Sequence, residues 1–110
     1  MASGSICLSL GWNGDINIAR ARAIEGKTGQ DVIATVPKDG AVLFFDMMAI
    51  PADAAHPKNA HAFMNYMMRP EVAASLTNKV KYANINKEGR KFVNPEILKN
   101  PSAYPTSAEM

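Results

Sequence analysis

The chain has 110 residues, of which 47% are apolar and 20% are charged, and its net charge is +2. These values are typical of one small globular domain, and the scattered Lys and Arg residues form no basic stripe that would bind nucleic acid. No apolar run approaches the ~20 residues of a membrane-spanning helix, and no basic segment precedes the first apolar stretch, so no secretory signal peptide is expected.

The first elements follow from a short apolar run and the polar turn after it. Residues 5–10 (SICLSL) are predicted to form a buried strand, in which Cys7, the single cysteine, is buried and has no partner for an internal disulfide. Residues 11–14 are predicted to form a turn that uses the two glycines there. Asp15 is then placed to cap a helix that ends at about Gly26. The apolar face of this predicted helix contains Ile16, Ala19 and Ala23.

Two further strands are predicted before the C-terminal half. Residues 31–36 (DVIATV) form the second strand, and a turn at residues 38–40 (KDG) leads into the third. Residues 41–50 (AVLFFDMMAI) are the most hydrophobic stretch of the chain and are expected to begin as a strand and continue as core.

The C-terminal half is predicted to be mainly helical. A buried helical face is indicated by apolar residues at the spacing i, i+3, i+4 and i+7, namely Ala60, Phe63, Met64, Met67 and Met68. Pro70 is expected to start the next helix, with Val72, Leu76 and Val80 pointing inward. A short helix over residues 95–99 follows. The order β-α-β-β-α-α favours an α/β layer architecture.

Phe44 and Asp46 provide the first indication of function. They are two residues apart, so on an extended segment they face the same side, whereas Phe45 faces the core. An aromatic ring beside a carboxylate suits an alkylammonium ion, because the ring attracts the cation and the carboxylate accepts a charge-assisted hydrogen bond. Asp46 lies within a very hydrophobic run with no obvious basic partner in the sequence, which favours a functional role.

A second aromatic–carboxylate pair is formed by Trp12 and Asp15, and Tyr82 is a third aromatic residue in a polar loop. Two such pairs suit a diamine, because each buried ammonium group needs its own anion. Taken singly, each residue has a structural alternative: Asp15 as a helix cap, and Trp12 and Phe44 as packing residues.

Other candidates for chemistry are weaker. Asp53, His56 and His61 have a spacing that matches no metal site, since His ligands on one helical face are four residues apart. Ser9, Ser75 and the histidines suggest no catalytic triad. The sequence therefore indicates no enzyme, no metal and no cofactor.

Four segments together resemble a known family. They are G-W-x-G-D at residues 11–15, V-P-K-D-G-A-V-L-F-F-D-M-M-A-I-P-A-D-A at 36–54, F-M-N-Y-M-M-R-P-E-V at 63–72, and Y-A-N-x-N at 82–86. In this order and at these spacings they resemble the C-terminal portion of the periplasmic putrescine/spermidine-binding proteins of bacterial ABC transporters. The resemblance extends over nearly the whole chain.

The resemblance implies a type II periplasmic-binding-protein fold, in which two α/β lobes close on the ligand, with both lobes incomplete here. Residues 1–28 would belong to one lobe, residues 29–87 to the other, and residues 88–110 would form a tail that crosses back. The family's polyamine contacts fall on five residues of this chain, all of matching type: Trp12, Asp15, Phe44, Asp46 and Tyr82.

The function implied by the resemblance is a periplasmic, non-enzymatic polyamine receptor that delivers its cargo to ABC permease subunits. Putrescine and spermidine both remain open as the ligand. The alternatives are a binding protein for another cationic solute, or a truncated fragment that binds no ligand and self-associates, forming a homo-oligomer.

Overall fold

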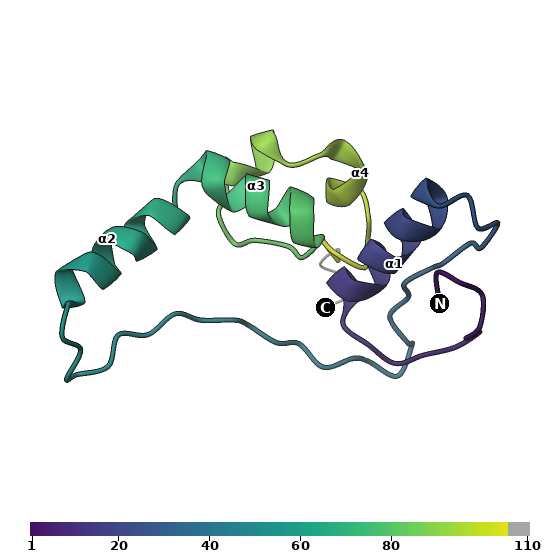
Figure 1. Cartoon of the computed structure of the whole chain (residues 1–110), viewed down its shortest axis with the longest axis horizontal. Helices are drawn as coiled ribbons and strands as arrows, with labels where there is room; N and C mark the ends of the chain where they lie inside the picture. Colours follow the sequence, from purple (N-terminus) through teal and green to yellow (C-terminus); the bar gives the residue numbers. More distant parts are fainter. Residues whose placement is uncertain (106–110) are drawn as a thin grey trace.

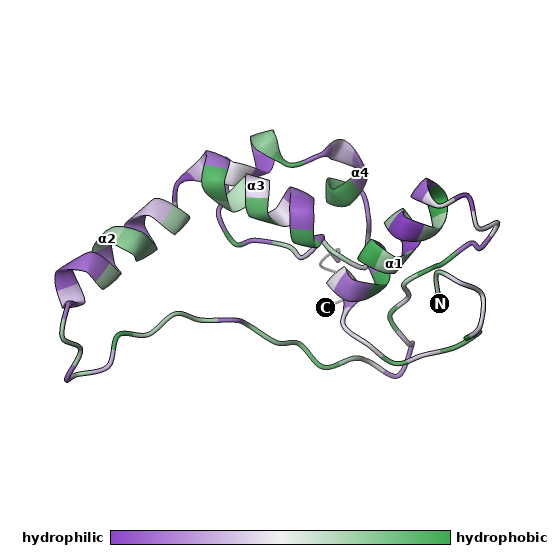
Figure 2. Ribbon diagram, viewed as in Figure 1, coloured by the Kyte–Doolittle hydropathy of each residue, from purple (hydrophilic) through white to green (hydrophobic). Residues whose placement is uncertain are grey.

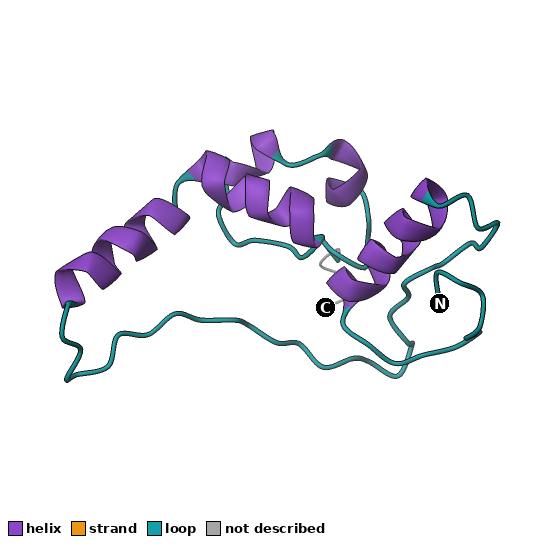
Figure 3. Ribbon diagram, in the orientation of Figure 1, coloured by secondary structure: helices purple, strands orange, loops and turns teal. Residues whose placement is uncertain are grey.

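A computed structural model describes residues 1–105, and the elements in that range are helices joined by loops (Figures 1 and 3). In chain order they are α1 (Asn13–Glu25), α2 (Pro57–Met67), α3 (Pro70–Val80), the 3-10 helix η1 (Glu88–Phe92) and α4 (Pro95–Leu98). Helix α3 contacts α1, α2 and η1, while α2 extends away from the others (Figure 1). Each helix within this range falls short of the length and apolar character that a bilayer crossing requires.

Proline fixes where three of the helices begin. Pro57, Pro70 and Pro95 each occupy the first position of their helix, where the missing N–H would have no helical partner. Arg69 and Asn94 precede two of them in an extended conformation, as the clash with a following proline ring requires. The predictions that Pro70 starts a helix and that a short helix follows Pro95 are confirmed.

Helix α1 begins earlier than predicted. Trp12 is its N-cap residue, in an extended conformation and with no capping hydrogen bond from its side chain, so the assignment of Asp15 as the cap is wrong. Residues 13 and 14 belong to the helix and not to a turn. Asp15 lies in the first turn, where its negative charge interacts favourably with the helix dipole. The helix ends at Gly26, as predicted, with the Gly26 N–H donating to the Arg22 carbonyl.

The three predicted strands do not form among the described residues. Residues 5–10, 31–36 and 41–50 are loops without ladder pairing, so the α/β architecture expected for them is not confirmed (Figure 3). A strand exists only when a neighbour completes its hydrogen bonds, and no described segment pairs with any of the three. The turn at residues 38–40 is confirmed, since the Gly40 N–H donates to the Pro37 carbonyl.

The core is small and lies between α3, η1 and the C-terminal segment. It consists of Ala74, Val93, Ile97 and Ala103, with Leu98 and Tyr104 packed against it. Asparagine side chains form hydrogen bonds at the edge of this core. The Asn84 side-chain amide donates to the hydroxyl of Thr77, which is 2% exposed. Asn78 donates to the Phe92 carbonyl. Helix α3 thus buries small residues at positions 73, 74 and 77 instead of the predicted Leu76, while Val72 and Val80 are half-buried.

Most large apolar side chains are exposed. Cys7, Phe45, Phe63 and Met68, which were predicted to be buried, are exposed, and α2 buries none of its residues. The loop between α1 and α2 contains many apolar residues, the green parts of it in Figure 2. Its exposed apolar residues include Val42, Leu43, Phe44, Phe45, Met47 and Met48. Apart from the contact of Phe44 with Trp12, these residues remain exposed in the described part of the chain. Such apolar surface is typical of interaction sites.

We propose that this surface makes the isolated chain self-associate. Val42 is 83% exposed and Met47 is 87% exposed, so replacing both with Lys should shift sedimentation toward the monomer by placing charges in the contact. Ile85, 90% exposed and outside the apolar stretch, provides the matched control Ile85→Lys, which should leave the sedimentation unchanged. A chain that is monomeric at every concentration would contradict the proposal.

Candidate functional site

The five residues singled out in the sequence converge from three separate stretches of chain. Trp12 and Phe44 meet with ring centroids 5.5 Å apart and ring planes inclined by 41°. Tyr82, on the loop after α3, reaches the first turn of α1, where Asp15 lies, and the Asp46 charge acts on its phenol. Residues more than 60 positions apart in sequence (12 and 82) thus contribute to one surface.

Gly14 allows Tyr82 to approach α1. A methyl group on Gly14 would overlap the Tyr82 ring atoms Cδ2, Cε2 and Cγ, so the ring lies directly on the helix backbone. Gly14 has no positive φ, and its role is therefore close approach and not turn formation. Lys81, at the end of α3, adopts a left-handed conformation (φ 62°) and turns the chain so that Tyr82 faces α1.

The phenol of Tyr82 reports on both carboxylates. Burial raises its pKa above the ordinary value of 10.0, and Asp15 raises the pKa further through a side-chain hydrogen bond and its negative charge. The backbone of Asp15 lowers the pKa by hydrogen bonding, and the charge of Asp46 raises it. Both acids thus act on the ionisation of the same phenol.

Neither acid of the site is neutralised by a basic side chain in the described part of the chain. The salt bridge found there joins Lys91 and Glu88, three residues apart on the surface. Asp15 and Asp46 are exposed, and each lies within three residues in the sequence of one member of the Trp12–Phe44 ring pair. Such an arrangement attracts cations with an organic body, because carboxylates accept hydrogen bonds from ammonium groups while ring faces attract the charge.

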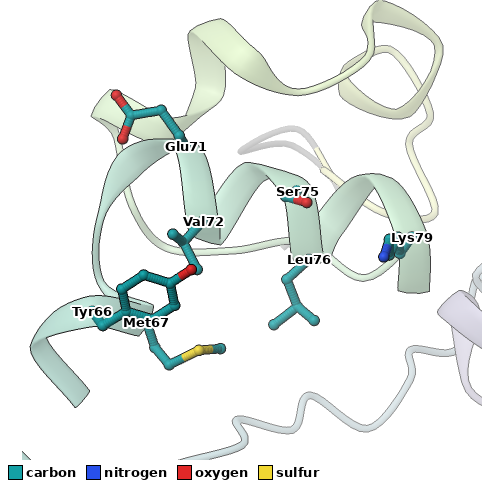
Figure 4. A pocket seen from close by; sticks show the side chains of 7 residues that line it. All are labelled: Tyr66, Met67, Glu71, Val72, Ser75, Leu76 and Lys79. Atoms are coloured by element: carbon teal, nitrogen blue, oxygen red, sulfur yellow. The ribbon is translucent and has the colours of Figure 1, made fainter. Parts of the chain in front are cut away.

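The site is an open surface. Trp12 is 51% exposed and Phe44 is 63% exposed. A shallow, open hollow lies elsewhere, between α2 and α3, where Met67, Val72 and Leu76 line it (Figure 4). Within residues 1–105, no group of three His, Cys, Asp or Glu side chains is placed to hold a metal ion.

Gly14 is the contributor that reasoning from the sequence missed. It was assigned to a turn because glycine before a helix usually serves a turn. The available signal was its place between Trp12 and Asp15, both of which were already singled out for function.

Replacing Gly14 with Ala should displace Tyr82 from α1 and lower the free energy of unfolding by about 1–3 kcal/mol, as overpacking does. Urea denaturation followed by circular dichroism measures this. Gly11→Ala is the matched control, because its added methyl would lie 3.7 Å from Ile16 in ordinary contact. Equal effects of the two substitutions would show that the Tyr82 ring does not lie on Gly14.

The raised pKa of Tyr82 links stability to high pH. Because the folded pKa lies above the unfolded value, the phenol stabilises the fold fully below about pH 10 and loses this contribution as the pH rises through the folded pKa. Asp15→Asn should lower the pKa of Tyr82 by removing a negative charge, as measured by NMR titration of the tyrosine ring. Asp53→Asn, in the loop before α2, should leave it unchanged.

Comparison with known proteins identifies the group to which this sequence is similar. The chain is 45% identical over 105 residues to the putrescine-binding periplasmic protein PotF of Escherichia coli, covering 96% of this chain and 28% of that protein. It is 41% identical over 110 residues to the putrescine-binding periplasmic protein SpuD of Pseudomonas aeruginosa, covering 100% and 30%. A spermidine/putrescine-binding periplasmic protein of Salmonella typhimurium is 31% identical over 102 residues, covering 93% and 28%.

The chain thus spans less than a third of the length of these relatives. The relatives are binding proteins by name, and the resemblance seen in the four sequence segments is confirmed. Residues 1–106 match the family described as bacterial extracellular solute-binding protein, and the chain belongs to that family.

Proposed function

We propose that this chain supplies part of the polyamine site of the solute-binding component of a bacterial ABC importer. The convergence of Trp12, Phe44, Asp15, Asp46 and Tyr82 on one surface carries the proposal. The names of the similar proteins, which bind putrescine or spermidine in the periplasm, support it. The ligand class is a short alkane chain with an ammonium group at each end.

The arrangement of rings and acids suits both parts of such a ligand. The inclined faces of Trp12 and Phe44, 5.5 Å apart, offer an apolar wall for the methylene groups and attract the adjacent charge. Asp15 and Asp46 are unpaired with basic side chains in the described chain, so each is available to one ammonium group. A monoamine would engage one acid and leave the other without a partner.

Tyr82 has a distinct role in this proposal. The Asp15 carboxylate raises the pKa of this phenol, which is neutral at physiological pH because even the ordinary tyrosine pKa of 10.0 lies far above it. A neutral phenol can donate to a carboxylate while accepting from an ammonium group. Tyr82 therefore holds Asp15 in place without introducing a negative charge of its own.

The wider role follows from the relatives and is part of the same proposal. The chain acts by binding and not by catalysis, in the periplasm, and hands its ligand to the permease subunits of the importer. Residues 1–28 and 29–87 belong to two lobes that close on the ligand, with residues 88–110 crossing back. The open walls predict weak binding by the 110-residue chain alone, since half-exposed rings leave the cation largely hydrated.

Titration of the chain with putrescine, followed by the emission of Trp12, its single tryptophan, tests the proposal. Asp46→Asn should weaken binding by about tenfold, the size expected for one charge-assisted hydrogen bond. Asp39→Asn removes the same charge from the turn at residues 38–40 and is the matched control. If butylamine binds as well as putrescine, or if both variants behave alike, the proposed site is wrong.

A further inference from the structure

The C-terminal residues 100–104 connect the two parts of the chain that carry Trp12, Asp15 and Tyr82. At one end they hold α1: the Asn13 side-chain amide donates to the Ser102 carbonyl at 2.6 Å, and that of Asn17 donates to the Ser102 hydroxyl at 3.1 Å. The Asn100 side chain in turn donates to Asn17 Oδ1 at 3.0 Å. Asn13 and Asn17 are four residues apart and therefore share one face of α1.

At the other end the same segment holds the loop that carries Tyr82. The Tyr104 hydroxyl accepts a hydrogen bond from the Asn84 backbone N–H at 3.2 Å, two residues after Tyr82. The Arg90 guanidinium lies over the Tyr104 ring, 5.5 Å from its centroid. Tyr104 also packs against the buried core, which fixes the position of its ring.

The segment is itself rigidly bonded. The Ser102 N–H and hydroxyl both donate to Asn100 Oδ1, at 3.0 and 2.8 Å. Ser102 and Ala103 are buried, and the Ala103 and Tyr104 N–H groups donate to the Asn100 carbonyl. A buried polar group must keep its partners, because losing one costs the desolvation that it has already undergone. Residues 100–104 therefore fix the position of α1 relative to the loop that carries Tyr82.

We propose that residues 100–104 form a clasp that positions the first turn of α1 against the Tyr82 loop. The clasp rests on the function proposed above, in that the geometry it fixes is that of the polyamine site. Its members are positioning residues: they act through Trp12, Asp15 and Tyr82. The clasp explains why residues separated by more than 80 positions (17 and 100) are joined by side-chain amides.

Two variants test the clasp from its two ends. Asn17→Ala removes the hydrogen bonds to Ser102 and Asn100 while favouring the helix. Tyr104→Phe removes only the oxygen that accepts from Asn84 and keeps the ring under Arg90. Asn65→Ala, at an exposed position of α2, is the matched control. Each variant is compared with the unaltered chain by acrylamide quenching of Trp12, by thermal unfolding, and by putrescine titration.

Asn17→Ala and Tyr104→Phe should each increase the quenching of Trp12 in the ligand-free chain and weaken putrescine binding, by about tenfold for Asn17→Ala, which loses two hydrogen bonds. The control should change neither. If both variants only lower the unfolding temperature, with Trp12 quenching and putrescine affinity unchanged, the clasp is merely structural and the proposal is overturned. Should Asn17→Ala fail to fold, Tyr104→Phe decides the question, since it deletes a single oxygen.

Failure of the clasp and failure of the polyamine site have different signatures. If the unaltered chain does not respond to putrescine while both variants expose Trp12, the ligand is wrong but the positioning by residues 100–104 stands. If the unaltered chain binds putrescine and the variants match it in every measurement except stability, the polyamine site stands and the clasp is refuted.

Discussion

The contact of the Tyr82 ring with the backbone of Gly14 is the constraint on which the arrangement of the site depends. It brings the loop after α3 onto the first turn of α1, and no side chain at position 14 would permit it. The ring lies against the residue that precedes Asp15, and the Asp15 carboxylate raises the pKa of the phenol. A residue without a side chain is what allows an aromatic ring to approach the helix backbone this closely.

The acids of the site and the apolar residues between α1 and α2 both lack partners among the described residues. The acids of the site remain free of basic partners among the described residues, so their field is available to a cationic guest. The apolar residues between α1 and α2 are equally free, but of neighbours that would cover them. The small core of Ala74, Val93, Ile97 and Ala103 leaves most large apolar side chains outside it.

Local rules predicted the local features well. Pro70 and Pro95 start helices because proline is suited to that position, and residues 38–40 turn because Gly40 adopts a positive φ. The strand predictions were not confirmed, because a strand needs a second segment to complete its hydrogen bonds and the sequence of one segment does not specify that partner. The prediction of burial was wrong at Phe63 and Cys7 for the same reason: helical spacing at Phe63 and apolar neighbours at Cys7 indicate residues to be covered but not what covers them.

The site was partly predictable from residue chemistry, since rings beside acids are uncommon and their pairing pointed to one kind of guest. The side-chain amides that hold it were not. Asn17, Asn84 and Asn100 read as ordinary polar residues, and their partners are distant in sequence. A single hydrogen bond of this type leaves no periodic pattern, because it depends on where three-dimensional packing places one atom.

The segment over residues 41–50 has a consequence for how the site would operate. It carries Phe44 and Asp46, yet no backbone–backbone hydrogen bond in the described chain anchors it. Trp12 and Asp15, by contrast, lie at the start of α1, and the loop that carries Tyr82 is held by the hydrogen bond from the Asn84 N–H to Tyr104. A guest that touches both halves would act as a cross-link, replacing contacts that the polypeptide lacks. Ligand binding would then order residues 41–50, and part of the binding free energy would offset the conformational entropy that this segment loses.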